Sequence, residues 1–273
     1  MTGGLARRGI ASDLLTEDLL CTRMASVVSV ARGQRECHCG IYQNRESGSH
    51  MKLSVLIPVY NEEDHIQELL SRVLAVPCTA EVVVVDDCSS DSTWNVLSQV
   101  NDPRLRVFRH EVNQGKGAAI RTALGHASSD MVIIQDADLE YDPNDYPKLL
   151  EPVLNGQAQV VYGVRDISAQ KLLFSLGNKF LSLVTSVLYG APVADMETCY
   201  KLMPRELMLS LDLQPSHFQI EPEITAKLLR RGYRIHEVPI WYQPRETHAK
   251  KLSAWRDGLP ALWTLIKYRF AGA

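Results

Sequence analysis

The stretch MVIIQDADLE, residues 131–140, decides the expected fold and site of this chain of 273 residues. It starts with an unbroken apolar run, which is typical of a strand buried on both faces of a parallel sheet. The run ends at two carboxylates, Asp136 and Asp138, separated by one small residue. Two carboxylates that turn toward a common point repel each other unless a cation lies between them, so the stretch predicts a divalent metal site.

A metal ion held by only one or two carboxylates keeps coordination positions for phosphate oxygens. Mg²⁺ or Mn²⁺ at this point therefore indicates a nucleotide diphosphate ligand. The alternative is an ordinary turn, because Asp also favours turns after strands. The segments around the pair decide between the two interpretations.

Strands and helices alternate before this stretch. We expect strands at residues 52–60, 81–87 and 105–108, followed by helices at residues 61–74, 89–97 and 118–127. Such alternation predicts an α/β fold with a Rossmann-like, mostly parallel sheet flanked by helices, and ligands bind beyond the carboxyl ends of its strands. Tyr60, Asp86 and Asp87 follow other strands, so they should share one rim with Asp136. That convergence favours the metal site.

The composition of the chain and the motifs that it lacks exclude several classes of protein. The chain is 45% hydrophobic and 22% charged with a formal net charge of -3, which is ordinary for a globular protein. No apolar run reaches the roughly 20 residues of a membrane span. The glycine motifs of dinucleotide oxidoreductases and P-loop phosphotransferases are absent from the sequence. No nucleic-acid partner is expected. The six cysteines follow no repeating spacing and no apolar leader precedes them, which favours a reducing cytosol.

Residues 1–50 differ from the rest of the chain because they show no sustained periodicity. They end in Gly48-Ser49-His50-Met51, which resembles a cloning remnant, so we expect the natural protein to begin at Met51. Three regions follow: an expression-derived or poorly ordered extension at 1–50, a catalytic domain at 51–245, and a basic amphipathic segment at 246–273.

Six segments carry a resemblance to a known family. Together they resemble family 2 glycosyltransferases of the GT-A fold, and the later ones look like dolichol-phosphate or polyprenyl-phosphate sugar synthases. The similarity covers about residues 52–270. The segments are PVYNEE (58–63), VVDDCSSDST (84–93), NQGKGAAIRTAL (113–124), DADLE (136–140), DMETCYKLM (195–203) and FQIEPEITAKLLRRGYRIHEVPIWY (218–242).

The resemblance implies a donor half that binds a nucleotide diphosphate sugar together with Mg²⁺ or Mn²⁺. The implied metal ligands are Asp136, Asp138 and Glu140, the last standing where relatives often have Gln. The implied nucleotide pocket consists of Pro58, Tyr60, Glu62, Asp86, Asp87 and Lys116.

The acceptor half is implied to bind a polyprenyl phosphate. Its expected phosphate ligands are Arg165, Arg245, Lys250 and Lys251, and the expected catalytic set is Asp136, Asp138, Asp195, Glu197 and Arg245. In relatives that use a hydroxyl acceptor, a carboxylate near Asp195 or Glu197 serves as general base. A lipid phosphate is already ionised near neutral pH and needs no such base.

Two segments of the second half suggest membrane contact. Residues 172–189 predict a long apolar helix that belongs either to the core or to the site. From Arg245 onward the chain carries six Lys or Arg against two acids, and residues 255–270 form an aromatic helix edged with cations. Such a helix either docks on the core or lies in a membrane interface, and we favour the interface. We expect a cytoplasmic protein attached peripherally to the inner face of the membrane.

The sequence therefore predicts a metal-dependent, inverting glycosyltransferase that uses a polyprenyl or dolichyl phosphate. One alternative is transfer to a saccharide or protein hydroxyl, with Asp195 or Glu197 as base. Another is a sugar-nucleotide-binding module without catalysis.

Overall fold

The computed structural model describes residues 51–166, 172–214, 220–244 and 254–270. All described residues belong to one compact unit of the chain, which spans residues 47–273. The extension expected at residues 1–50 lies outside the described residues.

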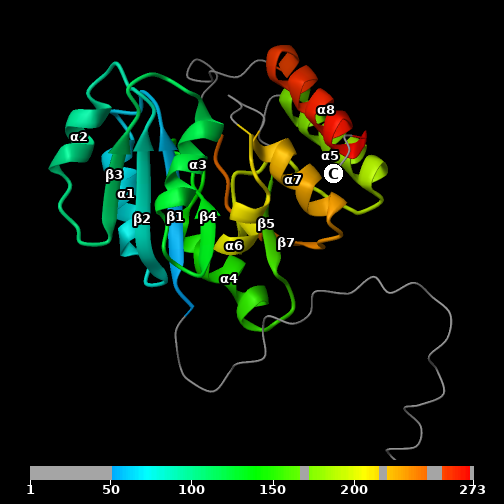
Figure 1. Ribbon diagram of the computed structural model, residues 1–273, viewed down its shortest axis with the longest axis horizontal. Helices are drawn as coiled ribbons and strands as arrows, with labels where there is room; N and C mark the ends of the chain where they lie inside the picture. The colour runs from blue at the N-terminus through cyan, green and yellow to red at the C-terminus, as the bar shows by residue number, and fades with distance from the viewer. Residues whose placement is uncertain (1–50, 167–171, 215–219, 245–253, 271–273) are drawn as a thin grey trace, which may run out of the picture. The chain divides into compact units, whose positions relative to one another are not determined.

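A seven-stranded sheet with the order β3-β2-β1-β4-β6-β5-β7 forms the centre of this unit (Figure 1). Neighbouring strands are parallel except at β6, which runs antiparallel to both β4 and β5. The mostly parallel α/β sheet predicted from the sequence is confirmed. The strands are β1 (Leu53–Val59), β2 (Thr79–Asp86), β3 (Leu105–Arg109), β4 (Met131–Ile134), β5 (Val160–Arg165), β6 (Lys201–Pro204) and β7 (Ile235–Ile240).

Helices cover both faces of this sheet, as Figure 1 shows. The helical elements are α1 (Ile66–Ala75), α2 (Thr93–Gln99), α3 (Lys116–His126), η1 (Pro143–Asp145), α4 (Tyr146–Leu154), α5 (Leu172–Tyr189), α6 (Arg205–Ser210), α7 (Ile220–Arg230) and α8 (Ala254–Phe270). On one face α1 and α4 pack against alternate strand residues, and on the other α3, α6 and α7 do so. Every residue of β1 and β4 is buried, which explains their unbroken apolar sequences.

The first helix begins later than the sequence predicted. We expected it to open at Asn61, but α1 begins at Ile66. Asn61 has a positive φ of 53°, so it turns the chain instead of starting a helix. The backbone N–H of Glu62 donates to Thr93 at the start of α2, and that of Glu63 donates to Asp91 in the loop before α2, so this turn is joined to the segment after β2.

A third apolar cluster joins α5, α7 and α8. Leu181 of α5 packs with Ala226 of α7 and Leu265 of α8 in this cluster. The Tyr189 hydroxyl donates to the Leu265 carbonyl oxygen at 2.8 Å, which ties the end of α5 to α8. The second half of the chain thus ends in a helical layer beside the sheet.

Candidate functional site

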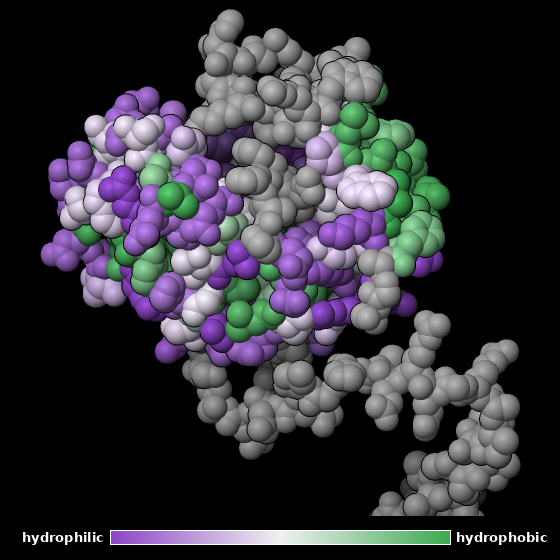
Figure 2. Space-filling view, turned by 45° about the horizontal axis from the view of Figure 1, so that its top comes forward, coloured by the Kyte–Doolittle hydropathy of each residue, from purple (hydrophilic) through white to green (hydrophobic). Residues whose placement is uncertain are grey.

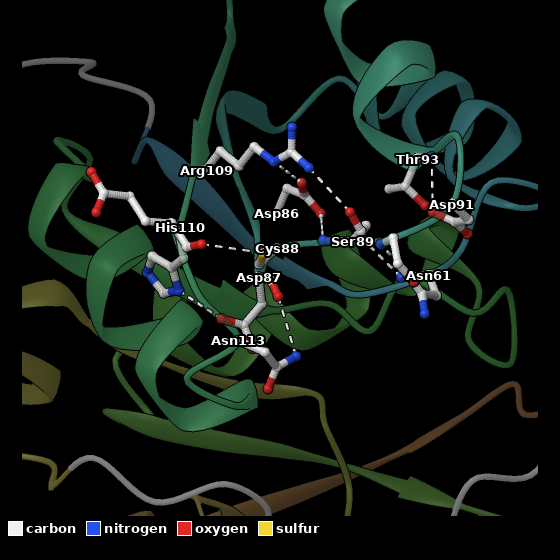
Figure 3. A network of polar contacts seen from close by, with 12 residues as sticks. Asn61, Asp86, Asp87, Cys88, Ser89, Asp91, Thr93, Arg109, His110 and Asn113 are labelled. Atoms are coloured by element: carbon white, nitrogen blue, oxygen red, sulfur yellow. Dashed lines mark hydrogen bonds and ion pairs between the residues drawn. The ribbon is translucent and has the colours of Figure 1, made fainter.

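The loops after β1 and β2 are joined by reciprocal hydrogen bonds (Figure 3). The Asn61 N–H donates to Ser89 Oγ at 3.0 Å, and Asn61 Oδ1 accepts from the Ser90 N–H at 2.8 Å. The Glu62 N–H donates to Thr93 Oγ1 at 2.8 Å. Tyr60 lies directly before this joint, is 39% exposed and is therefore accessible to a ligand. Pro58 is buried in the sheet beneath it.

Asp86 is the last residue of β2 and Asp87 follows it; both are buried, but they have different partners. Asp86 accepts from the Ser89 N–H at 3.1 Å and pairs with Arg109 Nε at 3.0 Å. Asp87 binds the chain before α3, because its carboxylate accepts the N–H of Gln114 at 2.9 Å and of Gly115 at 2.7 Å.

A histidine supports the Asp87 carboxylate. His110 Nδ1 lies 2.7 Å from Asp87 Oδ1 (Figure 3). His110 Nε2 lies 2.9 Å from Thr122 Oγ1 of α3. Gly115 has a φ of 89°, a conformation that glycine adopts without strain. Asp87 and His110 therefore fix the entry to α3, whose first residue is Lys116.

Lys116 connects Asp136, which follows β4, to Glu221 of α7. Its Nζ lies 2.7 Å from Asp136 Oδ1 and 2.6 Å from Glu221 Oε1. Burial lowers the pKa of Lys116, but the Asp136 and Glu221 carboxylates outweigh it and raise that pKa well above its usual value. The ammonium group is therefore charged at neutral pH.

The predicted metal ligands lie where β4 ends. Gln135 is fully buried and accepts the hydroxyl groups of Tyr146 at 2.6 Å and Tyr200 at 2.7 Å, while its own amide donates to the Asp136 carbonyl oxygen at 2.8 Å. These contacts fix the backbone at Asp136. Asp138 Oδ1 accepts from the Glu140 N–H at 3.2 Å.

Glu140 contacts Tyr242, which follows β7. Its carboxylate accepts from the Tyr242 hydroxyl at 2.7 Å, and the residue is nearly buried. The part of the chain that the structure describes contains no group of three or more His, Cys, Asp or Glu arranged to hold a metal ion. Asp136 nonetheless holds a cation, the Lys116 ammonium, and a pair of carboxylates fits a metal whose other ligands come from a diphosphate.

Arg165, the last residue of β5, and Asp195 form a buried ion pair. Arg165 Nε and Nη2 each lie 2.7 Å from an oxygen of Asp195, a bidentate arrangement. Burial lowers the pKa of Arg165, but the neighbouring Tyr141 and Asp195 outweigh it and raise that pKa above its usual value, so the guanidinium stays charged. Its carbon Cζ lies 5.2 Å from the centre of the Tyr242 ring, within reach of a cation–π contact.

Glu197 follows in the same loop. Its Oε1 is buried and has no hydrogen-bond partner among the described residues. Burial, and then the nearby Glu221 carboxylate, raise the pKa of Glu197 to about 7. A carboxyl group with this pKa can hold or release a proton near neutral pH.

Lys201 of β6 and Glu221 of α7 belong to this site, although the sequence did not single them out. Lys201 is fully buried and donates to the Met196 carbonyl oxygen at 2.8 Å, holding the loop that carries Asp195 and Glu197. Burial lowers the pKa of Lys201 to about 8, and the surrounding carboxylates oppose that effect. Two features of the sequence could have pointed to these residues: a lysine within an apolar strand, and the acidic pair of the EPE segment. Lys201 and both glutamates of that segment are buried.

The structure thus brings most predicted site residues to one edge of the sheet through a chain of contacts from the β1 loop to α7. The roles predicted for these residues are not tested by this geometry and stay predictions. Arg245, Lys250 and Lys251 lie outside the described residues.

The helix α5 exposes its apolar side. The residues on its inner side are mostly hydroxyl-bearing: Ser182 Oγ accepts the Met196 N–H at 3.0 Å, and Thr185 is fully buried. Figure 2 shows hydrophobic residues gathered on one side of the molecule. The exposed apolar residues are Leu176, Phe180, Leu183 and Val187 of α5 and Leu259, Trp263 and Phe270 of α8. We call this set the α5/α8 apolar face.

The sequence of this chain is similar to those of known glycosyltransferases. The model of the family described as "Glycosyl transferase family 2" matches residues 54–206. A dolichol-phosphate mannosyltransferase from Pyrococcus furiosus is 29% identical over 212 residues, which are 74% of this chain and 59% of that enzyme. An undecaprenyl-phosphate mannosyltransferase from Micrococcus luteus is 28% identical over 243 residues, 80% of this chain and 99% of that enzyme.

Among solved structures, the fold is similar to that of glucosyl-3-phosphoglycerate synthase from Mycobacterium tuberculosis in complex with Mn²⁺, UDP and phosphoglyceric acid. The TM-score is 0.65 at 22% identity, and the match covers 82% of this chain and 80% of the other. The fold is therefore the GT-A fold expected from the sequence. The chain spans 59% of the length of the Pyrococcus enzyme, so that relative contains additional sequence.

Proposed function

Because this chain belongs to glycosyl transferase family 2, we propose that it moves a sugar from a nucleotide diphosphate sugar to the phosphate of a polyprenyl or dolichyl phosphate, with inversion at the anomeric carbon. Two relatives are named for prenyl-phosphate acceptors, which supports this acceptor class. The proposal covers the donor, the metal and the acceptor.

The observation that carries the proposal is the position of α5. Its inner side binds the Met196 N–H in the loop of Asp195 and Glu197, while its outer side exposes Leu183 and Val187 to solvent. An exposed apolar helix suits a lipid surface better than water. The acceptor phosphate of a membrane lipid would thus arrive beside Arg165 and Asp195. No helix among the described residues is long and apolar enough to cross a membrane.

On the donor side, Asp136 and Asp138 would hold Mg²⁺ or Mn²⁺ with the diphosphate, which stabilises the negative charge of the leaving nucleotide. Glu140 is the third proposed ligand. Tyr60 and Glu62 would contact the nucleoside, and Lys116 would contact the phosphates. Asp86 and Asp87 would shape the pocket by fixing the two loops that their hydrogen bonds join.

The acceptor phosphate would be the nucleophile of a single displacement. Its oxygen forms the bond to the anomeric carbon while the bond from that carbon to the nucleotide diphosphate breaks, which inverts the configuration. Arg165 would orient the phosphate, because its pairing with Asp195 fixes the guanidinium plane and uses its Nε and Nη2 groups. Arg245, Lys250 and Lys251 are proposed as further phosphate ligands. The enzyme would act on the cytoplasmic face of the membrane.

A panel of donors tests this proposal. The chain is incubated with GDP-mannose, UDP-glucose or UDP-N-acetylglucosamine, with Mg²⁺ or Mn²⁺, and with or without a short polyprenyl phosphate, and nucleotide release is measured. We expect release that requires the lipid. In Asp138→Asn, release should fall by about 100-fold or more, since even outer-shell partners of metal ligands contribute 10- to 100-fold. Asp142→Asn, in the same loop, is the matched control and should retain activity.

The other outcomes separate the alternatives. Nucleotide release that does not require the lipid would contradict the phosphate acceptor. Nucleotide binding without turnover by any donor would support a non-catalytic binding module.

Transfer to a saccharide or protein hydroxyl is a second candidate, favoured by the raised pKa of Glu197, which suits a general base. Replacing Glu197 with Gln removes that base and keeps the side-chain shape. Under the phosphate proposal we expect less than about a tenfold loss of kcat, because a phosphate acceptor needs no proton removed. Near-complete loss in a folded variant would favour the hydroxyl acceptor.

A further inference from the structure

Lys116 lies at the position where the proposed function requires a metal ion to bind. Its Nζ is 2.7 Å from Asp136 Oδ1, and the two side chains are 22% and 24% exposed, so a ligand can reach both. An ammonium at this distance neutralises the carboxylate. A divalent cation that uses Asp136 must therefore compete with Lys116.

Glu221 offers the same ammonium a second partner. Its Oε1 is 2.6 Å from Lys116 Nζ, and its side chain is only 8% exposed. Glu221 lies in the first turn of α7, where every residue from Ile220 to Ala226 is buried, so its carboxylate is fixed in place. Lys116 can leave Asp136 and keep one ion pair.

The backbone around Lys116 is fixed while its side chain is long. Asp87 accepts the N–H groups of the two preceding residues, and Gly115 makes the turn into α3. The first residue of a helix also lies where backbone N–H groups favour anions. A diphosphate that arrives at this end of α3 would therefore give the Lys116 ammonium a new partner without a backbone rearrangement.

We propose that Lys116 makes metal binding depend on the nucleotide: in the donor-free chain it occupies Asp136, and a bound diphosphate, with Glu221, draws it away and opens Asp136 to the divalent cation. This inference rests on the proposed function, and it adds an order to the binding steps. The cation then binds tightly only together with the nucleotide diphosphate, since each ligand binds better when the other is present. Product release lets the lysine return.

The test measures Mn²⁺ binding and needs no catalysis. The affinity of the purified chain for Mn²⁺ is determined by electron paramagnetic resonance, alone and with saturating GDP or UDP. We expect Lys116→Met to tighten binding of Mn²⁺ alone by about tenfold, because the competing charge is gone, and to reduce the enhancement by nucleotide. Lys227→Met is the matched control: it removes an ammonium paired with Glu223 on α7 and should leave Mn²⁺ affinity unchanged.

Glu221→Gln should have the opposite effect on Mn²⁺ affinity. This substitution removes one of the two carboxylates that Lys116 contacts, so the ammonium remains paired with Asp136. We expect binding of Mn²⁺ alone to weaken severalfold. In the double variant of Lys116 and Glu221, the Glu221 substitution should have no further effect, which a double-mutant cycle measures. If Glu221→Gln weakens Mn²⁺ binding equally with and without Lys116, Glu221 acts by long-range charge alone and the inference is wrong.

The Mn²⁺ measurements distinguish a failure of the proposed function from a failure of the Lys116 inference. If the wild-type chain binds no Mn²⁺ even with GDP or UDP, the proposed metal-dependent function fails. If it binds Mn²⁺ with nucleotide but Lys116→Met binds Mn²⁺ alone no better than the wild type, the function stands and the inference is overturned. Circular dichroism of each variant checks that its fold is intact.

Discussion

At the scale of single residues, the proposed acceptor side contains opposite charges that are buried together. Arg165 and Lys201 face Asp195, Glu197 and Glu221, and these three acids all affect the pKa of Lys201. Burying a charge is costly unless a partner compensates it. Lys116 also pairs with Glu221, at 2.6 Å. Burial, and then the Glu221 carboxylate, raise the pKa of Glu197 to about 7.

The raised pKa of Glu197 predicts how the free energy of unfolding depends on pH. Glu197 has a folded-state pKa raised from 4.5 to about 7, so it contributes stability at low pH that is lost as pH rises through this range. Glu197→Gln cannot ionise. We expect the unfolding free energy of the variant, relative to wild type, to increase by about 1–3 kcal/mol between pH 5 and pH 8. Urea denaturation at both pH values measures it, and a pH-independent difference would show that Glu197 is not held protonated.

Sequence reasoning singled out the carboxylates after β4 because they stand where an expected strand ends, and it named Lys116 only through the resemblance to family 2 glycosyltransferases. It did not identify Lys201 or Glu221. A lysine in a strand and a glutamate in a helix normally face solvent, and only the packing of β6 against α7 buries both. The partners of Asp87 were equally hidden, since they depend on where the loop before α3 returns to β2.

At the scale of elements, α5 departs from an ordinary surface helix because it buries Ser182 and Thr185 beside Leu181 while it exposes large apolar residues. The sequence showed an apolar helix at residues 172–189 but not which side the protein would cover. The hydroxyl groups of Ser182 and Ser186 find partners in the loop after α5, and the apolar residues are left outside. With Trp263 of α8, the α5/α8 apolar face suits insertion into a membrane interface.

Replacing Leu183 with Glu tests this face. Leu183 is 62% exposed, so we expect little change in thermal stability but about a tenfold weaker sedimentation with vesicles of anionic phospholipid, because a buried Leu contributes roughly 1.5–3 kcal/mol. Leu154→Glu is the control, since Leu154 is also exposed but lies on α4. Equal losses in both variants, or no vesicle binding by the wild type, would contradict membrane contact through α5.

At the scale of the whole molecule, the alternation of apolar strands and helices was enough to predict the sheet and the rim where its first strands end. It did not predict that β6 lies between β4 and β5 and runs antiparallel to both, because the hydrophobic pattern of a strand does not determine which strands pair with it. That insertion places the loop of Asp195 and Glu197 near the end of β4. In the proposed function, the segments from β1 to β4 form the donor half of the site, and those from β5 to α7 form the acceptor half.

The most direct test of the central claim is a competition between acceptors in one reaction. The chain receives its active donor, a divalent cation, and equal amounts of a short polyprenyl phosphate and the matching polyprenol, and the lipid products are identified by mass spectrometry. The account predicts that the sugar appears on the phosphate alone. A glycosylated polyprenol, with the polyprenyl phosphate unchanged, would contradict it and make the hydroxyl acceptor the better description.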